Sequence, residues 1–88
     1  MDIRNEIVDI IRGAQEAEGR PEVTDLSDTD SMTVGAGLDS LALIAVILAV
    51  EARFKIDAYR HFINGGSDQL GEFVAYCSAE VASVISRP

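Results

Sequence analysis

The sequence predicts an all-α fold, a small four-helix bundle with three longer helices, one short third helix and a long first loop. Apolar residues recur at helical spacing in three segments, whereas no segment shows the alternation of a β-strand. The length of 88 residues fits one compact domain, so we expect a single domain over residues 1–88.

The first predicted helix begins near residue 3 and ends near Gly19-Arg20-Pro21. Its apolar face consists of Ile3, Ile7, Ile10, Ile11 and Ala14. Residues 20–39 then form a long loop containing Pro21, Gly35 and Gly37. We expect scattered apolar residues to hold this loop on the core, namely Val23, Leu26, Met32, Val34 and Leu38.

The second helix is predicted from Asp39 or Ser40 to Phe54, since either residue can cap it. Asp57 is expected to cap a short helical segment that runs through Ile63. Asn64-Gly65-Gly66 then breaks the chain, and Ser67 is expected to cap the last helix. The apolar face of that helix is predicted to comprise Leu70, Phe73, Val74, Cys77, Val81, Val84 and Ile85.

The net charge of −8 arises from 15 acidic and 7 basic residues. Nucleic acids and anionic membranes are poor partners for such a chain, because their phosphates repel it. The acidic surface can steer the protein toward basic patches on partner proteins, or it can simply keep a small monomer in solution. Charge does not decide between these two interpretations.

Cysteine and histidine each occur once, as Cys77 and His61, so we expect neither an intramolecular disulfide nor a metal site. The longest apolar run, Leu41 to Val50, has ten residues. A membrane-spanning helix needs about 20 residues, so none is expected. The charged N-terminal segment lacks the apolar region of a signal peptide, and we therefore expect a cytoplasmic protein.

Ser40 stands at a predicted helix N-terminus, after a loop that contains Gly35 and Gly37. The first N–H groups of a helix lack intrahelical partners and the helix dipole is positive there, so a phosphate ester on the hydroxyl would be favourably placed. The alternative is an ordinary Asp-Ser cap, which local chemistry alone favours.

The segment Gly37-Leu38-Asp39-Ser40-Leu41 resembles the attachment motif of acyl carrier proteins, in which Asp-Ser-Leu opens the second helix. The similarity continues to Glu51-Ala52-Arg53-Phe54-Lys55-Ile56, which resembles the Glu-rich, Phe-ended close of that helix. The order and lengths of the other segments also match, so the resemblance covers nearly the whole chain.

This resemblance implies that a phosphopantetheinyl transferase, using coenzyme A and magnesium, attaches 4′-phosphopantetheine to Ser40. The thiol of the arm would carry acyl groups as thioesters between the enzymes of one pathway. Asp39 matches the acidic residue that helps the transferase recognise the serine. The chain itself would be no enzyme, and neither residue a catalytic nucleophile.

A hydrolase would need a different arrangement of Ser40, Asp39 and His61. The segment around Ser40 lacks the two glycines of a G-x-S-x-G elbow, and no sheet is predicted to support one. We therefore expect His61 to be a surface or boundary residue on the short third helix and predict no catalytic residues.

The second helix departs from the family because Ala42 and Ala45 occupy positions where many acyl carriers have acids. One apolar stripe is expected to face the core, namely Leu43, Val46, Ile47, Val50 and Phe54. The other, here called the second stripe, consists of Leu41, Ile44, Ala45, Leu48 and Ala52. It either binds a partner or packs against the first loop and third segment.

These departures favour a specialised, discrete carrier in fatty-acid, lipid or polyketide biosynthesis. An aminoacyl or peptidyl carrier would share the fold and the arm, although Asp39 and the charge of −8 favour the acyl carrier. A third hypothesis is an unmodified helical interaction module, in which Ser40 is only a cap and the second stripe binds a partner.

Overall fold

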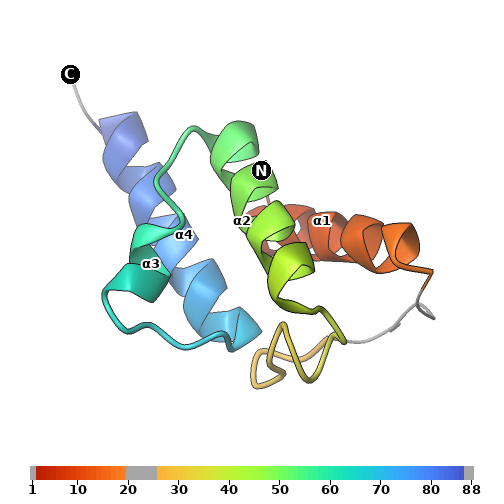
Figure 1. Ribbon diagram of the computed structural model, residues 1–88. Coiled ribbons are helices and arrows are strands. Elements are labelled where there is room, and N and C mark those ends of the chain that lie inside the picture. Colours follow the sequence, from red (N-terminus) through yellow and green to blue (C-terminus); the bar gives the residue numbers. More distant parts are fainter. Residues whose placement is uncertain (1, 20–25, 87–88) are drawn as a thin grey trace.

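Four helices form the fold in the computed structural model, which describes residues 2–19 and 26–86 (Figure 1). They are α1 (Ile3–Ala17), α2 (Ser40–Phe54), α3 (Arg60–Ile63) and α4 (Leu70–Ser86). The first helix packs against both α2 and α4. Within the described ranges no strand forms, and β pairing is limited to one isolated bridge between Ser31 and Gln69. The predicted all-α class is therefore confirmed.

The first helix forms where the sequence predicted it. Asp2 caps it by accepting a hydrogen bond from the Asn5 backbone N–H at 3.1 Å. The predicted apolar face is confirmed, because Ile7 and Ile11 are fully buried and the rest of the face is partly buried against the core. The helix ends at Ala17, two residues before Gly19, whose positive φ of 70° turns the chain away.

The core face of α2 also matches the expected stripe. Val46, Ile47, Val50 and Phe54 are buried, and Leu43 is partly buried against the same cluster. Ala42 is buried with them, whereas Ala45 is exposed. The helix closes at Lys55, which takes up a left-handed conformation with φ 59° while its N–H donates to the Glu51 carbonyl oxygen.

The long loop contacts the core through Leu26, Met32 and Leu38, as predicted. Val34 was expected there as well, but its side chain is 90% exposed, so that prediction is wrong. The reason is a tight turn, in which Ser31 Oγ accepts the backbone N–H of Val34 at 2.7 Å and leaves Val34 at the surface. Val23 lies outside the described residues.

The last two helices differ from the prediction mainly at their starts. The short α3 begins at Arg60 with Tyr59 as its N-cap residue, so the prediction of Asp57 as the cap is wrong, although Asp57 Oδ1 accepts the Arg60 N–H at 3.2 Å. The last helix begins at Leu70 rather than directly after Ser67, whose hydroxyl accepts the Gln69 N–H at 3.3 Å. The N–H groups of Leu70 and Gly71 instead donate to loop carbonyl oxygens, those of Asp30 and Asp28, each at 2.9 Å.

The predicted apolar face of α4 is only partly buried. Leu70, Phe73 and Cys77 are buried, with Val74 and Val81 partly buried, but Val84 and Ile85 are exposed. The prediction for these last two residues is wrong because the final turn of α4 leads out to the C-terminal tip (Figure 1). No helix in the described part of the chain is long and apolar enough to cross a membrane.

Candidate functional site

Ser40 is the first residue of α2 and is exposed to solvent. Of the two residues predicted to cap the helix, Asp39 does so, because its Oδ1 accepts the Ala42 N–H at 2.8 Å. The Asp39 carbonyl oxygen accepts the Leu43 N–H at 2.9 Å. The capping role is therefore filled by the neighbouring aspartate, and the Ser40 hydroxyl stands exposed in the positive field of the helix N-terminus.

The chain reaches Ser40 through a compact turn. Ser31 closes this turn, because its Oγ accepts the Gly35 N–H at 3.3 Å and its carbonyl oxygen accepts the Ala36 N–H at 2.9 Å. A side chain at Gly35 would meet that carbonyl oxygen at 2.7 Å, so a larger residue would disturb the turn. The side chain of Leu38 is buried in the core, and the next two residues, Asp39 and Ser40, are exposed. Leu38 therefore anchors the chain just before the two exposed residues.

Two neighbouring elements hold this turn in place. From α1, the fully buried Gln15 donates from Nε2 to the Ala36 carbonyl oxygen at 2.7 Å. From the segment before α4, Asp68 accepts the Met32 N–H at 2.9 Å and the Thr33 hydroxyl at 2.5 Å. Gln15 was not identified from the sequence, although its position four residues after Ile11 on the apolar face of α1 was an available signal.

The second stripe is exposed along α2. Leu41, Ile44 and Leu48 are 79%, 47% and 58% exposed, and the two alanines of the stripe are exposed as well. Packing of this stripe against the first loop and the third segment, the alternative left open by the sequence, is thus not what the structure shows. A contiguous exposed apolar surface on a small protein is typical of a binding site. Its role as a partner surface stays a prediction.

A groove of about 420 Å³ continues the second stripe toward α3. It is lined by Ile44, Ile47, Leu48, Glu51, Asp57, Tyr59 and Ile63. Both helices contribute apolar side chains to it, and two carboxylates also line it, of which Glu51 accepts the Tyr59 N–H at 3.2 Å. The apolar surface that begins beside Ser40 therefore extends onto a second element.

The charged residues near the far end of the second stripe are largely engaged within the protein. Arg53 pairs with Glu6 of α1, and Arg60 pairs with Asp57 at 3.5 Å. An exposed ion pair of this kind contributes only about 0–1 kcal/mol to stability. Each pair joins one positive and one negative charge, so neither pair contributes to the net charge of −8.

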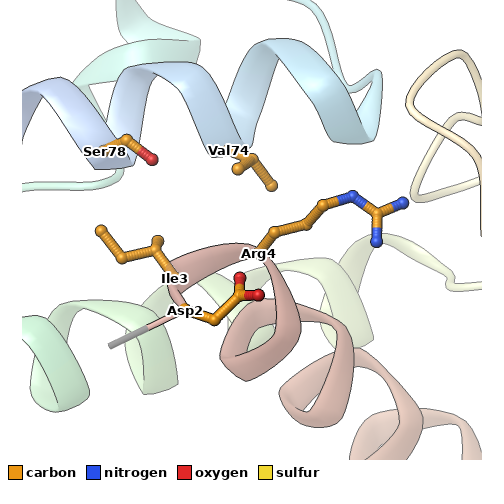
Figure 2. A pocket seen from close by; sticks show the side chains of 5 residues that line it. All are labelled: Asp2, Ile3, Arg4, Val74 and Ser78. Carbon is orange, nitrogen blue, oxygen red and sulfur yellow. The ribbon is translucent and has the colours of Figure 1, made fainter.

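A second hollow, of about 530 Å³, lies between the start of α1 and α4 (Figure 2). Its polar side chains have structural partners. Asp2 caps α1, and Arg4 extends toward the loop, where it donates to the Leu26 carbonyl oxygen at 2.7 Å and to Asp28 at 3.0 Å. These contacts tie the N-terminal helix to the loop, and they account for the polar groups of the hollow other than Ser78.

His61 lies on α3 and is half-buried, as predicted. Its Nε2 is hydrogen-bonded to the Ser67 carbonyl oxygen at 2.8 Å, and its ring centroid lies 4.9 Å from that of Phe62 and 5.8 Å from that of Phe73. Because Asp39 is engaged with the Ala42 N–H, the two groups that would have to activate Ser40 in a triad have other partners.

Burial also determines the state of the single thiol. Cys77 is fully buried, and this desolvation, with a further contribution from Glu80, raises its pKa to about 12. The thiol is therefore neutral at pH 7 and shielded from reagents. In the parts of the chain that the structure describes, no three His, Cys, Asp or Glu residues are grouped so as to hold a metal ion.

The site thus offers one exposed hydroxyl at a helix N-terminus, a carboxylate beside it and an apolar surface that runs away from it. Such a hydroxyl can be esterified without disturbing the core, and an attached phosphate would lie close to the positive end of α2. Comparison with known proteins found no matching family model, no matching curated protein and no matching solved structure.

Proposed function

We propose that this protein is an acyl carrier protein that bears 4′-phosphopantetheine on Ser40. The observation that carries the proposal is the exposed Ser40 hydroxyl at the first residue of α2, within an Asp-Ser-Leu sequence whose aspartate already caps the helix. We place it among specialised, discrete carriers of fatty-acid, lipid or polyketide-type pathways, since α2 lacks acids at two positions where many such carriers have them.

The attachment step is a phosphoryl transfer catalysed by a separate phosphopantetheinyl transferase. Ser40 Oγ forms a bond to the phosphorus that carries the pantetheine, the hydroxyl proton leaves, and the adenosine bisphosphate half of coenzyme A departs. The new phosphodiester retains one negative charge, which the N-terminus of α2 stabilises by roughly 0.3–1 kcal/mol. The carrier itself contributes an accessible nucleophile and a recognisable surface, and its partner enzymes perform the acyl chemistry.

Intact mass spectrometry tests the proposal directly. Purified protein is incubated with coenzyme A, magnesium and a broad-specificity phosphopantetheinyl transferase, and it is expected to gain the mass of one phosphopantetheine. Reactions without transferase or without coenzyme A serve as controls. If an active transferase leaves the mass unchanged, the carrier proposal fails, and the exposed second stripe then favours the unmodified interaction module.

An aminoacyl or peptidyl carrier is the neighbouring alternative, because it would show the same mass gain. Asp39 beside the serine and the charge of −8 favour the acyl carrier. The cargo is separated by loading the arm with matched acyl and aminoacyl groups and measuring which of them the partner enzymes of the pathway accept.

Replacement of Asp39 is expected to slow modification more than it lowers stability. The carboxylate stands exposed beside Ser40, where it can pair with a basic transferase, whereas loss of its cap costs about 0.5–2 kcal/mol. Asp39→Asn is the matched control, because the amide oxygen keeps the cap but removes the charge. Initial rates of arm attachment and thermal melts should show slower attachment in both Asp39→Ala and Asp39→Asn, with the larger melting change in Asp39→Ala. Wild-type rates in Asp39→Asn would show that Asp39 acts only as a cap.

A further inference from the structure

Gln15 occupies an unusual place for a polar residue. It lies on the apolar face of α1, one turn after Ile11, and it is the only polar side chain found buried in the described part of the chain. Its amide Nε2 donates to the carbonyl oxygen of Ala36, 21 residues later, at 2.7 Å. The hydrogen bond therefore joins the last turn of α1 to the turn that leads into Ser40.

This arrangement is not what core packing alone would select. A buried amide loses its hydration and requires hydrogen bonds in return. Gln15 recovers one bond, whereas its Oε1 is buried without a partner among the described residues. A leucine or methionine would fill a similar volume without this cost, so the amide is best explained by the particular group that it contacts.

That group belongs to a short, well-defined segment of the site. Both backbone groups of Ala36 are engaged, its N–H with the Ser31 carbonyl oxygen at 2.9 Å and its carbonyl oxygen with Gln15. Gly37 follows with a positive φ of 75°, and then the buried Leu38 leads into Asp39 and Ser40. The orientation in which the chain enters α2 therefore depends on where Ala36 is held.

We infer that Gln15 is a positioning residue for the modification site, which fixes the segment Ala36–Ser40 in the conformation that the phosphopantetheinyl transferase recognises. This inference rests on the proposed carrier function. Without the Gln15 amide, the buried Ala36 carbonyl oxygen loses its partner, and the segment must shift to reach water or another donor. Loss of the Gln15 amide is expected to change the position of Ser40 in the docked complex and not the reactivity of its hydroxyl, because Gln15 contacts Ala36 and not Ser40.

The test compares Gln15→Met with Ile11→Val in steady-state arm attachment. Gln15→Met removes the donor at similar volume and is expected to raise the KM of the transferase for the carrier about three- to tenfold, with a smaller change in kcat. Ile11→Val shortens a fully buried side chain on the same face of α1 and leaves the hydrogen bond from Gln15 to Ala36 in place. It is expected to lower the melting temperature while leaving KM at the wild-type value. Equal KM values in Gln15→Met and wild type would overturn the inference.

Hydrogen exchange supplies a readout that does not depend on the carrier function. In the wild-type protein, the side-chain amide protons of Gln15 should exchange far more slowly than those of an exposed amide such as Asn64. Where Gln15→Met folds, it should lose protection in residues 36–43 but not in α4. Rapid exchange of the Gln15 amide in the wild type would overturn the inference. Absence of any arm attachment to the wild type would instead refute the proposed function, and hydrogen exchange would then test only the contact between Gln15 and Ala36.

Discussion

Ser40→Ala is expected to abolish phosphopantetheine attachment completely while leaving the helical fold intact. The variant lacks the oxygen that would form the phosphodiester, and the exposed Ser40 hydroxyl supplies no cap, since Asp39 accepts the Ala42 N–H. An exposed substitution of this kind should change the free energy of unfolding by no more than about 0.5 kcal/mol. Intact mass and circular dichroism melts measure the two effects on the same samples.

Ser83→Ala is the matched control for that experiment. Ser83 is also exposed, but it lies in the last turn of α4, where the backbone N–H groups are engaged within the helix and the nearby end of the helix dipole is negative. It should be modified at the wild-type rate. Attachment that persists in Ser40→Ala, or that disappears in Ser83→Ala, would show that the arm is carried by a serine other than Ser40.

Periodicity and capping chemistry predicted much of this fold. The apolar spacing of residues 3–14 located the buried face of α1, and the same reasoning located the core stripe of α2. The start of α2 followed from a capping residue, because Asp39 offers the side-chain oxygen that the first helical N–H groups need. The candidate serine was likewise identified from its motif and its position at a helix start.

The failures concern residues whose burial depends on contacts that apolar spacing does not reveal. Val34 lies in a turn closed by Ser31. Ile85 lies on the final turn of α4, where the helical spacing of apolar residues continues but the side chain is exposed. Spacing identifies one face of a helix, but it does not reveal whether another element covers that face. Gln15 was missed for a related reason, because its hydrogen bond is to Ala36, which is 21 residues later in the sequence.

The two stripes of α2 show most clearly what the structure adds. The sequence presented an apolar helix and left open whether its second stripe was covered. Neighbouring residues prove to have opposite environments, because Ile47 is 3% exposed and Leu48 is 58% exposed. Both side chains border the groove toward α3, so the boundary between core and surface runs between them. Substitutions at Ile47 and Leu48 can therefore separate the contribution of the core stripe to stability from the contribution of the second stripe to partner binding.

Ile47→Glu and Leu48→Glu are therefore expected to fail in different ways. Ile47→Glu places a carboxylate in the core without a partner, which costs several kcal/mol or more. A domain of this size has total stability near the low end of the usual range of about 5–15 kcal/mol, so Ile47→Glu should lose its cooperative thermal transition. Leu48→Glu should melt within a few degrees of the wild type, because its side chain already meets water.

The expected defect of Leu48→Glu is in acyl transfer. If a partner enzyme covers the second stripe, the new carboxylate is desolvated against an apolar surface, and single-turnover transfer should fall at least about tenfold, equivalent to about 1.4 kcal/mol. Ala45→Glu should show a smaller loss, and it has a second use. It adds an acid where many acyl carriers have one, so a partner with a basic patch would accept it faster than the wild type. If the partner surface is apolar, both variants should transfer more slowly than the wild type while they melt at the wild-type temperature. Full transfer by Leu48→Glu would exclude the second stripe as the surface on which the partner enzyme docks.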